Sequence, residues 1–172
     1  MDSLIARIKQ RVADPRLAVD AATWVEPMPT IAPPATHAEV DAAEAALGFA
    51  IPPLLRRLYT EVGNGGFGPS YGLEGVPTIP STPYTADIVA LYEMYNSEPP
   101  AEHPSDVWPR GWVPLIGGGC LYMECVDFLN PPHAVAMFDG NDCDFEQPVT
   151  ASLTPVAASL AERLEAWLAG SH

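Results

Sequence analysis

Residues 36–75 constrain the fold more than any other part of the chain, because their capping and turn residues define where helices begin and end. Thr36 and Glu39 form the T-x-x-E pattern of a capping box, in which each side chain binds a free backbone donor at the helix start. Glycine is the residue type that most often ends a helix, and it stands here at position 48. The pattern therefore predicts a short helix between Thr36 and Gly48.

A second helix is predicted directly after the first. Pro52 and Pro53 suit its first turn, where the missing N–H of proline costs nothing. Apolar residues then recur at helical spacing, at Leu54, Leu55, Leu58 and Val62. A glycine-rich run, residues 63–68, ends the helix. A phosphate-binding loop would follow a strand and open a helix, so we interpret this run as a helix C-cap and tight turn.

Helices and strands are also predicted on either side of this region. The first is an amphipathic helix at residues 4–12, joined by a proline-rich connector at 26–34. This helix could fold back on the acidic body or serve as an arm, and the sequence favours neither. We expect two domain segments, 1–35 and 36–170.

The second half of the chain predicts an α+β fold. A helix is expected at 84–95 and a last helix at 155–168, with Thr154 as its cap and Gly170 as its stop. Short apolar or alternating runs between turn residues predict strands at 113–116, 121–128 and 134–138. Helices before and after a mainly antiparallel sheet define this class.

The order of these features resembles the SUKH superfamily, the Smi/Knr-type proteins, over roughly residues 36–169. The motifs that carry the resemblance are Leu47-Gly48, Ile51-Pro52-Pro53, Asn64-Gly65-Gly66, Tyr71-Gly72-Leu73, Trp112-Val113-Pro114-Leu115-Ile116 and Gly117-Gly118-Gly119. The resemblance implies a single domain with a mainly antiparallel, mixed sheet flanked by N-terminal helices and a C-terminal helix. It also implies that the shared motifs, Trp112 among them, belong to the structural scaffold.

The resemblance further implies a non-enzymatic protein-binding module. Bacterial members of the superfamily are commonly immunity proteins of polymorphic toxin or contact-dependent systems, which bind and neutralise a cognate toxin, often a nuclease. Fungal members are regulatory scaffolds in cell-wall assembly signalling. We therefore expect an immunity protein, with a regulatory scaffold that lacks a toxin target as the alternative.

The charge of the chain indicates the kind of partner. The sequence has 22 acidic and 8 basic residues, a net charge of -14, and residues 58–172 contain only Arg110 and Arg163 as bases. Direct nucleic-acid binding needs clustered Lys and Arg, so it is disfavoured. A basic protein partner, such as a toxin domain with a cationic cleft, fits the charge. Acidity can also serve solubility alone.

Two acidic surfaces are candidates for partner binding on composition. The first is a predicted hairpin tip that crowds four acids into eight residues: Asp139, Asp142, Asp144 and Glu146. The second is a loop in which an exposed aromatic residue would act as an anchor beside acids: Glu98, Glu102, Asp106 and Trp108. The tip departs from a calcium loop, since Asp144 stands where glycine is needed and Thr150 where the closing glutamate should be.

A cysteine-dependent enzyme is the weakest alternative. Cys120 follows three glycines, and His133 or His103 could act as its base, but a thiol buried in a strand would be inert. The three cysteines include no C-x-x-C pair and the histidines show no metal-ligand spacing, so we expect neither a cofactor nor a metal. The N-terminus does not resemble a signal peptide and no run approaches the about 18 apolar residues of a membrane span. We therefore expect a cytoplasmic protein.

Overall fold

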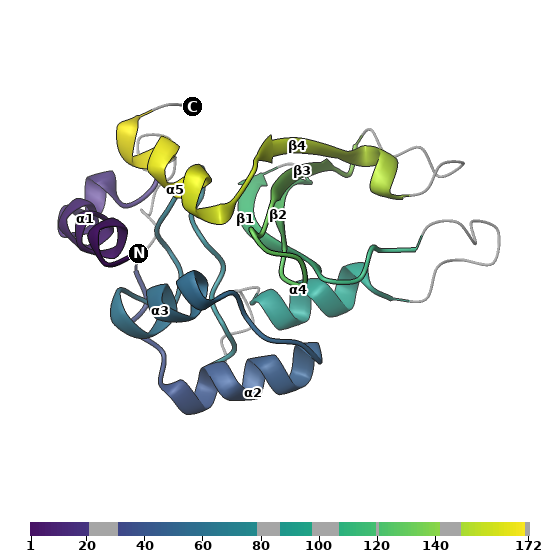
Figure 1. Cartoon of the computed structure of the whole chain (residues 1–172), viewed down its shortest axis with the longest axis horizontal. Helices are drawn as coiled ribbons and strands as arrows, with labels where there is room; N and C mark the ends of the chain where they lie inside the picture. Colours follow the sequence, from purple (N-terminus) through teal and green to yellow (C-terminus); the bar gives the residue numbers. More distant parts are fainter. Residues whose placement is uncertain (21–30, 79–86, 98–106, 120, 142–148, 171–172) are drawn as a thin grey trace.

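The computed structural model describes the chain except residues 21–30, 79–86, 98–106, 120, 142–148 and 171–172. Its described part has an α+β fold, as predicted, with helices to the left of and below a twisted sheet in the view of Figure 1. The sheet has the order β1-β2-β3-β4, and every pairing within it is antiparallel. Its strands are β1 (Trp112–Gly119), β2 (Tyr122–Asp127), β3 (Val135–Asp139) and β4 (Leu153–Ala157).

The helices begin and end largely where their capping residues predict. They are α1 (Asp2–Val12), α2 (His37–Leu47), α3 (Pro53–Glu61), α4 (Ile88–Tyr95) and α5 (Leu160–Ala169). At the start of α2, the Glu39 backbone N–H donates to Thr36 Oγ1 at 3.2 Å, and Thr36 N–H donates to Glu39 Oε2 at 2.7 Å. Gly48 ends α2 in the left-handed conformation. The predicted capping box is thus confirmed in both directions.

Two helix starts differ from the prediction. Helix α4 begins at Ile88, later than expected, because Asp87 is its N-cap and accepts hydrogen bonds from the N–H groups of Val89 and Ala90. The last helix begins at Leu160, and Thr154 and Pro155 lie in β4. Proline suits the first turn of a helix, but it also suits an edge strand, where its missing donor can face away from the neighbouring strand.

Ser159 is the true cap of α5. Its side chain accepts a hydrogen bond from the Glu162 backbone N–H at 3.1 Å, so an S-x-x-E pattern downstream of Thr154 marks the helix start. The pairing of β4 with β3, which places Pro155 opposite Ala136, decides between the two starts. The stop at Gly170 is confirmed.

Helix α1 packs against the body of the protein, which answers the question that its sequence leaves open. Leu4, Ile5 and Ile8 are buried in the same hydrophobic core as the sheet. The guanidinium of Arg11 lies 4.5 Å from the centre of the Trp167 ring of α5, and Figure 1 shows α1 beside α5. The first helix and the rest of the described chain therefore share one core.

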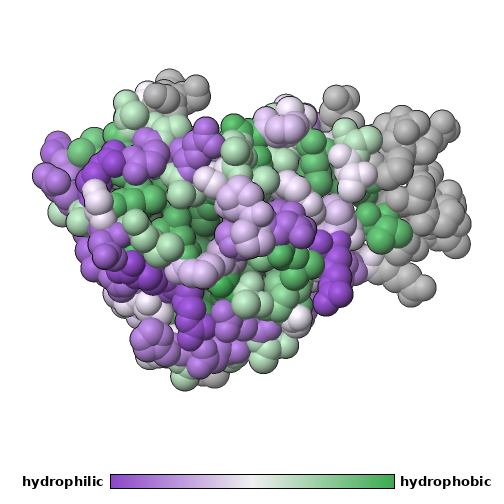
Figure 2. All heavy atoms as spheres, viewed as in Figure 1, coloured by the Kyte–Doolittle hydropathy of each residue, from purple (hydrophilic) through white to green (hydrophobic). Residues whose placement is uncertain are grey.

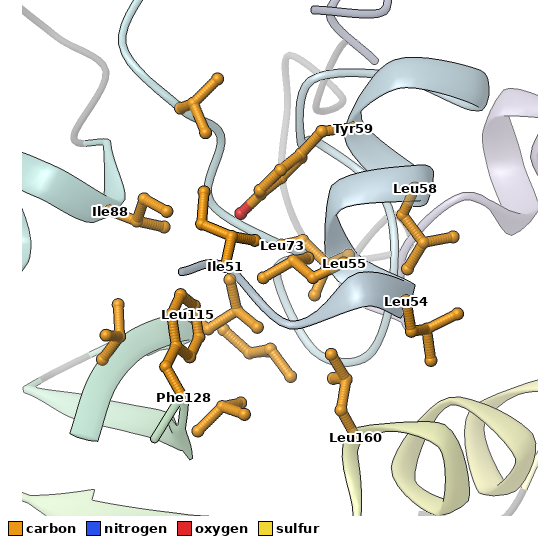
Figure 3. Close-up of a cluster of buried hydrophobic side chains, with 14 of the residues drawn as sticks. Ile51, Leu54, Leu55, Leu58, Tyr59, Leu73, Ile88, Leu115, Phe128 and Leu160 are labelled. Carbon is orange, nitrogen blue, oxygen red and sulfur yellow. The ribbon is translucent and has the colours of Figure 1, made fainter. Parts of the chain in front are cut away.

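Helix α3 lies at the centre of that core. Figure 3 shows Leu55 and Tyr59 of α3 directed toward Leu115 of β1, in a cluster that also includes Phe128 and Leu160. The buried Tyr59 hydroxyl donates to the Glu74 carbonyl oxygen at 2.7 Å, so its polar group is satisfied. Through this cluster, α3 packs against both β1 of the sheet and the start of α5.

The glycine-rich run after α3 is a structural turn, as predicted, but its glycine does not cap the helix, since the C-cap of α3 is Val62 in the right-handed conformation. The buried Asn64 side chain imitates a paired strand: its Nδ2 donates to the Val76 carbonyl and its Oδ1 accepts from the Val76 N–H, both at 2.8 Å. Gly65 follows with φ +85°. This turn positions residues 71–75 beside β1, where Leu73 bridges to Ile116.

Candidate protein-binding surface

The predicted acidic hairpin tip is described only at its beginning. Asp139 ends β3, and its Oδ1 accepts hydrogen bonds from the Asn141 backbone N–H at 2.9 Å and from Asn141 Nδ2 at 3.0 Å. Asp142, Asp144 and Glu146 lie outside the described residues. Asp139 pairs with Tyr122 across the two strands, so Asp139 lies beside the start of β2.

Trp108, the aromatic residue predicted to anchor the second surface, is buried. Trp108 is only 4% exposed, so the expectation that it lies on the surface is wrong. Its ring lies 4.7 Å from that of Tyr95 and 5.1 Å from that of Phe138, and its Nε1 donates to the Trp112 carbonyl at 2.6 Å. Burial stabilises the large ring once its single donor has a partner. The acids predicted beside it lie outside the described residues: Glu98, Glu102 and Asp106.

Three large side chains are exposed where β1 meets β2. Tyr71, Leu121 and Tyr122 are 43%, 61% and 39% exposed. Tyr122 pairs with Gly119 of β1 on one side and with Asp139 of β3 on the other. Sequence reasoning did not single out these three residues.

The glycines at the end of β1 leave room for Tyr122 and Tyr71. A Cβ on Gly119 would lie 3.3 Å from ring atoms of Tyr71, and one on Gly118 would lie 2.9 Å from the Cβ of Tyr122. The Tyr71 backbone N–H also donates to the Gly117 carbonyl at 3.1 Å. Tyr71 and Tyr122 therefore lie against glycine backbone. A side chain at Gly119 would displace Tyr71, and one at Gly118 would displace Tyr122.

A hollow of about 230 Å³ lies between Ser70, Tyr122, Glu124 and Met137. Both Glu124 carboxylate oxygens accept hydrogen bonds from Arg163, at 2.7 and 2.8 Å. This ion pair connects β2 to α5 and balances the charge of Glu124. A larger hollow of about 660 Å³ follows the edge strand β4, and its lining includes Trp112, which is half-buried, and Val156.

Most basic side chains form ion pairs with carboxylates of the same chain. Seven of the eight lie within ion-pair distance of a carboxylate: Arg7, Lys9, Arg11, Arg16, Arg56, Arg57 and Arg163. Most of them belong to α1, α3 and the segment after α1, and Figure 2 shows hydrophilic residues gathered over that side of the molecule. The eighth, Arg110, precedes the start of β1, at the opposite end of this strand from Gly119.

Glu74 lies near the glycines of β1. Its Oε1 would be 3.5 Å from a Cβ on Gly117. Burial, and secondarily the negative charge of Asp87, raise the pKa of Glu74 from 4.5 to about 7. The carboxyl group therefore changes charge near neutral pH.

Replacing Glu74 by glutamine is expected to stabilise the protein at pH 8 by about 2 kcal/mol, and to have no effect below pH 4.5. The folded state holds this proton more tightly than the unfolded state, so the parent loses stability as the pH rises from 4.5 to about 7. Urea unfolding across this range measures the difference. Glu93→Gln, on the exposed side of α4, should leave stability almost unchanged. A Glu74→Gln effect that is constant with pH would contradict the assignment.

The residues considered for catalysis or metal binding are only partly described. Cys120, Cys143 and His103 lie outside the described residues. Burial raises the pKa of the Cys125 thiol far above its ordinary value, so this cysteine is neutral. His133 Nδ1 lies 2.9 Å from the Asp127 carbonyl oxygen. Where the chain is described, no group of three or more His, Cys, Asp or Glu side chains is arranged to hold a metal ion, and no helix could cross a membrane.

Comparison with known proteins identifies one family. The sequence model of the SMI1 / KNR4 family (SUKH-1) matches residues 34–166. The match begins just before α2 and ends within α5, so it includes the whole sheet and leaves α1 outside. No curated protein matches the chain.

Proposed function

We propose that this chain, which belongs to the SMI1 / KNR4 family (SUKH-1), is an immunity protein that binds and neutralises a basic, nuclease-like bacterial toxin. Family membership supports a non-catalytic interaction module. The toxin as partner is the step that we add. The protein would act in the cytoplasm, the compartment that its sequence predicts.

The observation that carries the proposal is the distribution of charge. The chain has twenty-two acidic and eight basic residues, and seven of the bases form ion pairs with carboxylates of the same chain. The excess negative charge must therefore be solvated or meet a cation from outside. A nuclease cleft is basic because it binds phosphates, so an acidic protein can occupy it in place of the nucleic acid.

Neutralisation in this scheme requires no chemistry from the immunity protein. Long-range attraction would speed the encounter, and a few desolvated contacts would determine how long the complex lasts. The bound chain would exclude the substrate from the toxin's cleft. Inhibition should therefore be stoichiometric and reversible.

A pull-down from the source lysate tests the proposal, with the tagged chain as bait at low and high salt and mass spectrometry of the captured proteins. We expect one basic, toxin-like domain, held less strongly at high salt because screening weakens charge attraction. The purified domain should lose its activity at one equivalent of the chain. Capture of several housekeeping proteins without a toxin would overturn the proposal and favour the regulatory scaffold.

A further inference from the structure

We infer that the hollow beside β4 is the contact surface for the partner, and that it receives an extended, basic segment of a second protein. This hollow of about 660 Å³, which we call the edge groove, is lined by residues that include Trp112, Ala136, Pro155, Val156 and Glu162. The inference rests on the proposed function, since it identifies where the binding takes place. The shape of the groove, the open edge of the sheet and the charge of the lining support it.

The edge groove has room for a large side chain because much of its lining is small and apolar. Ala136 of β3 pairs with Pro155 of β4, so their side chains lie on one face of the sheet. Trp112 of β1 lies on that face too, by the register that joins β1, β2 and β3. Three further alanines line the groove: Ala134, Ala157 and Ala158. The alanines leave space that a side chain from another protein can occupy.

An irregularity of β4 directs Val156 toward the edge groove. Pro155 and Ala157 pair with adjacent residues of β3, so Val156 between them is the extra residue of a β-bulge. A bulge interrupts the alternation of side chains, and Pro155, Val156 and Ala157 all line the groove. Val156 is still 41% exposed. The bulge therefore presents an apolar side chain that the core of the protein does not cover.

The edge of the sheet indicates an extended occupant. In the described part of the chain β4 pairs with β3 alone, and Figure 1 shows β4 at the border of the sheet. Sheet edges are commonly protected by charged side chains, and residues 153–157 contain none. An added strand binds such an edge through its backbone, and its alternate side chains enter an adjoining pocket. Since Pro155 lacks a backbone donor, side-chain contacts in the groove must supply part of the affinity.

Charge determines what else the segment must carry. Glu162 is the one charged side chain among the described residues that line the edge groove. Its Oε2 accepts a hydrogen bond from the Ala158 backbone N–H at 3.0 Å, and its Oε1 makes no hydrogen bond or ion pair within the described part of the chain. The neighbouring Arg163 is held by Glu124. A lysine or arginine of another protein can therefore pair with Glu162.

A second copy of this chain fits the edge groove poorly. Two copies carry -14 each, and residues 153–157 of the second copy contain no base to pair with Glu162 of the first. Self-association through β4 would therefore bring like charges together. The occupant is a basic protein and not a homodimer partner.

A short peptide of alternating isoleucine and arginine is the first probe, titrated into the full isotope-labelled chain and followed by NMR. A peptide with glutamate in place of arginine is its control. We expect only the arginine peptide to bind, with the largest shift changes at residues 134–136 and 153–158. Equal binding of both peptides, shifts centred elsewhere, or an absence of binding would overturn the inference.

Variants of the lining test the individual contacts of the arginine peptide. Val156→Ala should weaken binding by about fivefold through lost apolar contact. Glu162→Gln keeps the acceptor for the Ala158 N–H and should weaken binding by about threefold. Ala158→Trp, at an exposed position of the lining, should fill the groove and weaken binding by about tenfold or more. Thr154→Ala is the matched control, because Thr154 is exposed in the same strand and does not line the groove. An equal effect of Thr154→Ala and Val156→Ala would contradict the assigned contact.

The partner captured in the pull-down provides the second arm. In calorimetry, Ala158→Trp should weaken its binding by about 30-fold, while thermal unfolding stays unchanged. If a toxin binds the parent and Ala158→Trp equally, the groove is wrong and the immunity function stands. If a basic protein that is not a toxin loses binding in Ala158→Trp, the groove stands and the immunity function fails. Association of the chain with itself that Ala158→Trp abolishes would contradict the assigned occupant.

Discussion

Replacing Gly65 by alanine is expected to lower the free energy of unfolding by about 3 kcal/mol or more, whereas the same change at Gly48 should cost about 1 kcal/mol. Both glycines have positive φ, +85° and +77°, so alanine is strained at either site. The difference lies in their surroundings. A Cβ on Gly65 would lie 2.7 Å from the Leu73 carbonyl oxygen and 2.8 Å from the Gly75 nitrogen, whereas one on Gly48 would meet nothing within 4 Å.

Urea unfolding of both variants, followed by circular dichroism, measures the two costs. Gly48→Ala is the matched control, since it isolates the cost of the backbone conformation from that of the clash. The atoms that crowd Gly65 belong to the backbone and cannot rotate away as a side chain could. Equal costs at the two positions would show that the turn can move. The structural role assigned to the Asn64-Gly65-Gly66 motif would then be wrong.

Replacing Arg163 by methionine should lower the free energy of unfolding by about 3 kcal/mol. Arg163 and Glu124 have side chains only 13% and 15% exposed, and two hydrogen bonds join them. Removing the guanidinium leaves the Glu124 carboxylate partly buried without its cation. The cost comes mainly from this stranded charge and only in part from the lost attraction.

A double variant tests that explanation. Arg163→Met combined with Glu124→Leu removes both charges and should recover most of the lost stability, because two apolar side chains can pack where the pair stood. Arg16→Ala breaks a surface pair with Asp14, in which the arginine side chain is 79% exposed, and should change stability very little. If the double variant is as unstable as Arg163→Met, packing and not charge accounts for the loss.

Local patterns in the sequence determined both ends of α2, the C-terminal stop of α5, the glycine turn and the class of fold. Thr36 and Glu39 are three residues apart, and Gly48 ends its helix through its own conformation, so each acts within about one helical turn. The first three strands were predictable for a similar reason, since alternation and turn residues are visible along the chain, whereas β4 was assigned to the last helix. The negative charge, from which a cationic partner was predicted, is a property of composition and needs no fold.

The tertiary structure alone decided which of several locally acceptable arrangements occurs. Pro155 suits a helix start and an edge strand equally, and only pairing with β3 selected the strand. Trp108 could lie on a surface or in a core, and the rings of Tyr95 and Phe138 favoured burial. Tyr71 and Gly119 are distant in sequence and meet only because residues 71–75 lie beside β1. Contacts of this kind depend on partners that no short window of sequence contains.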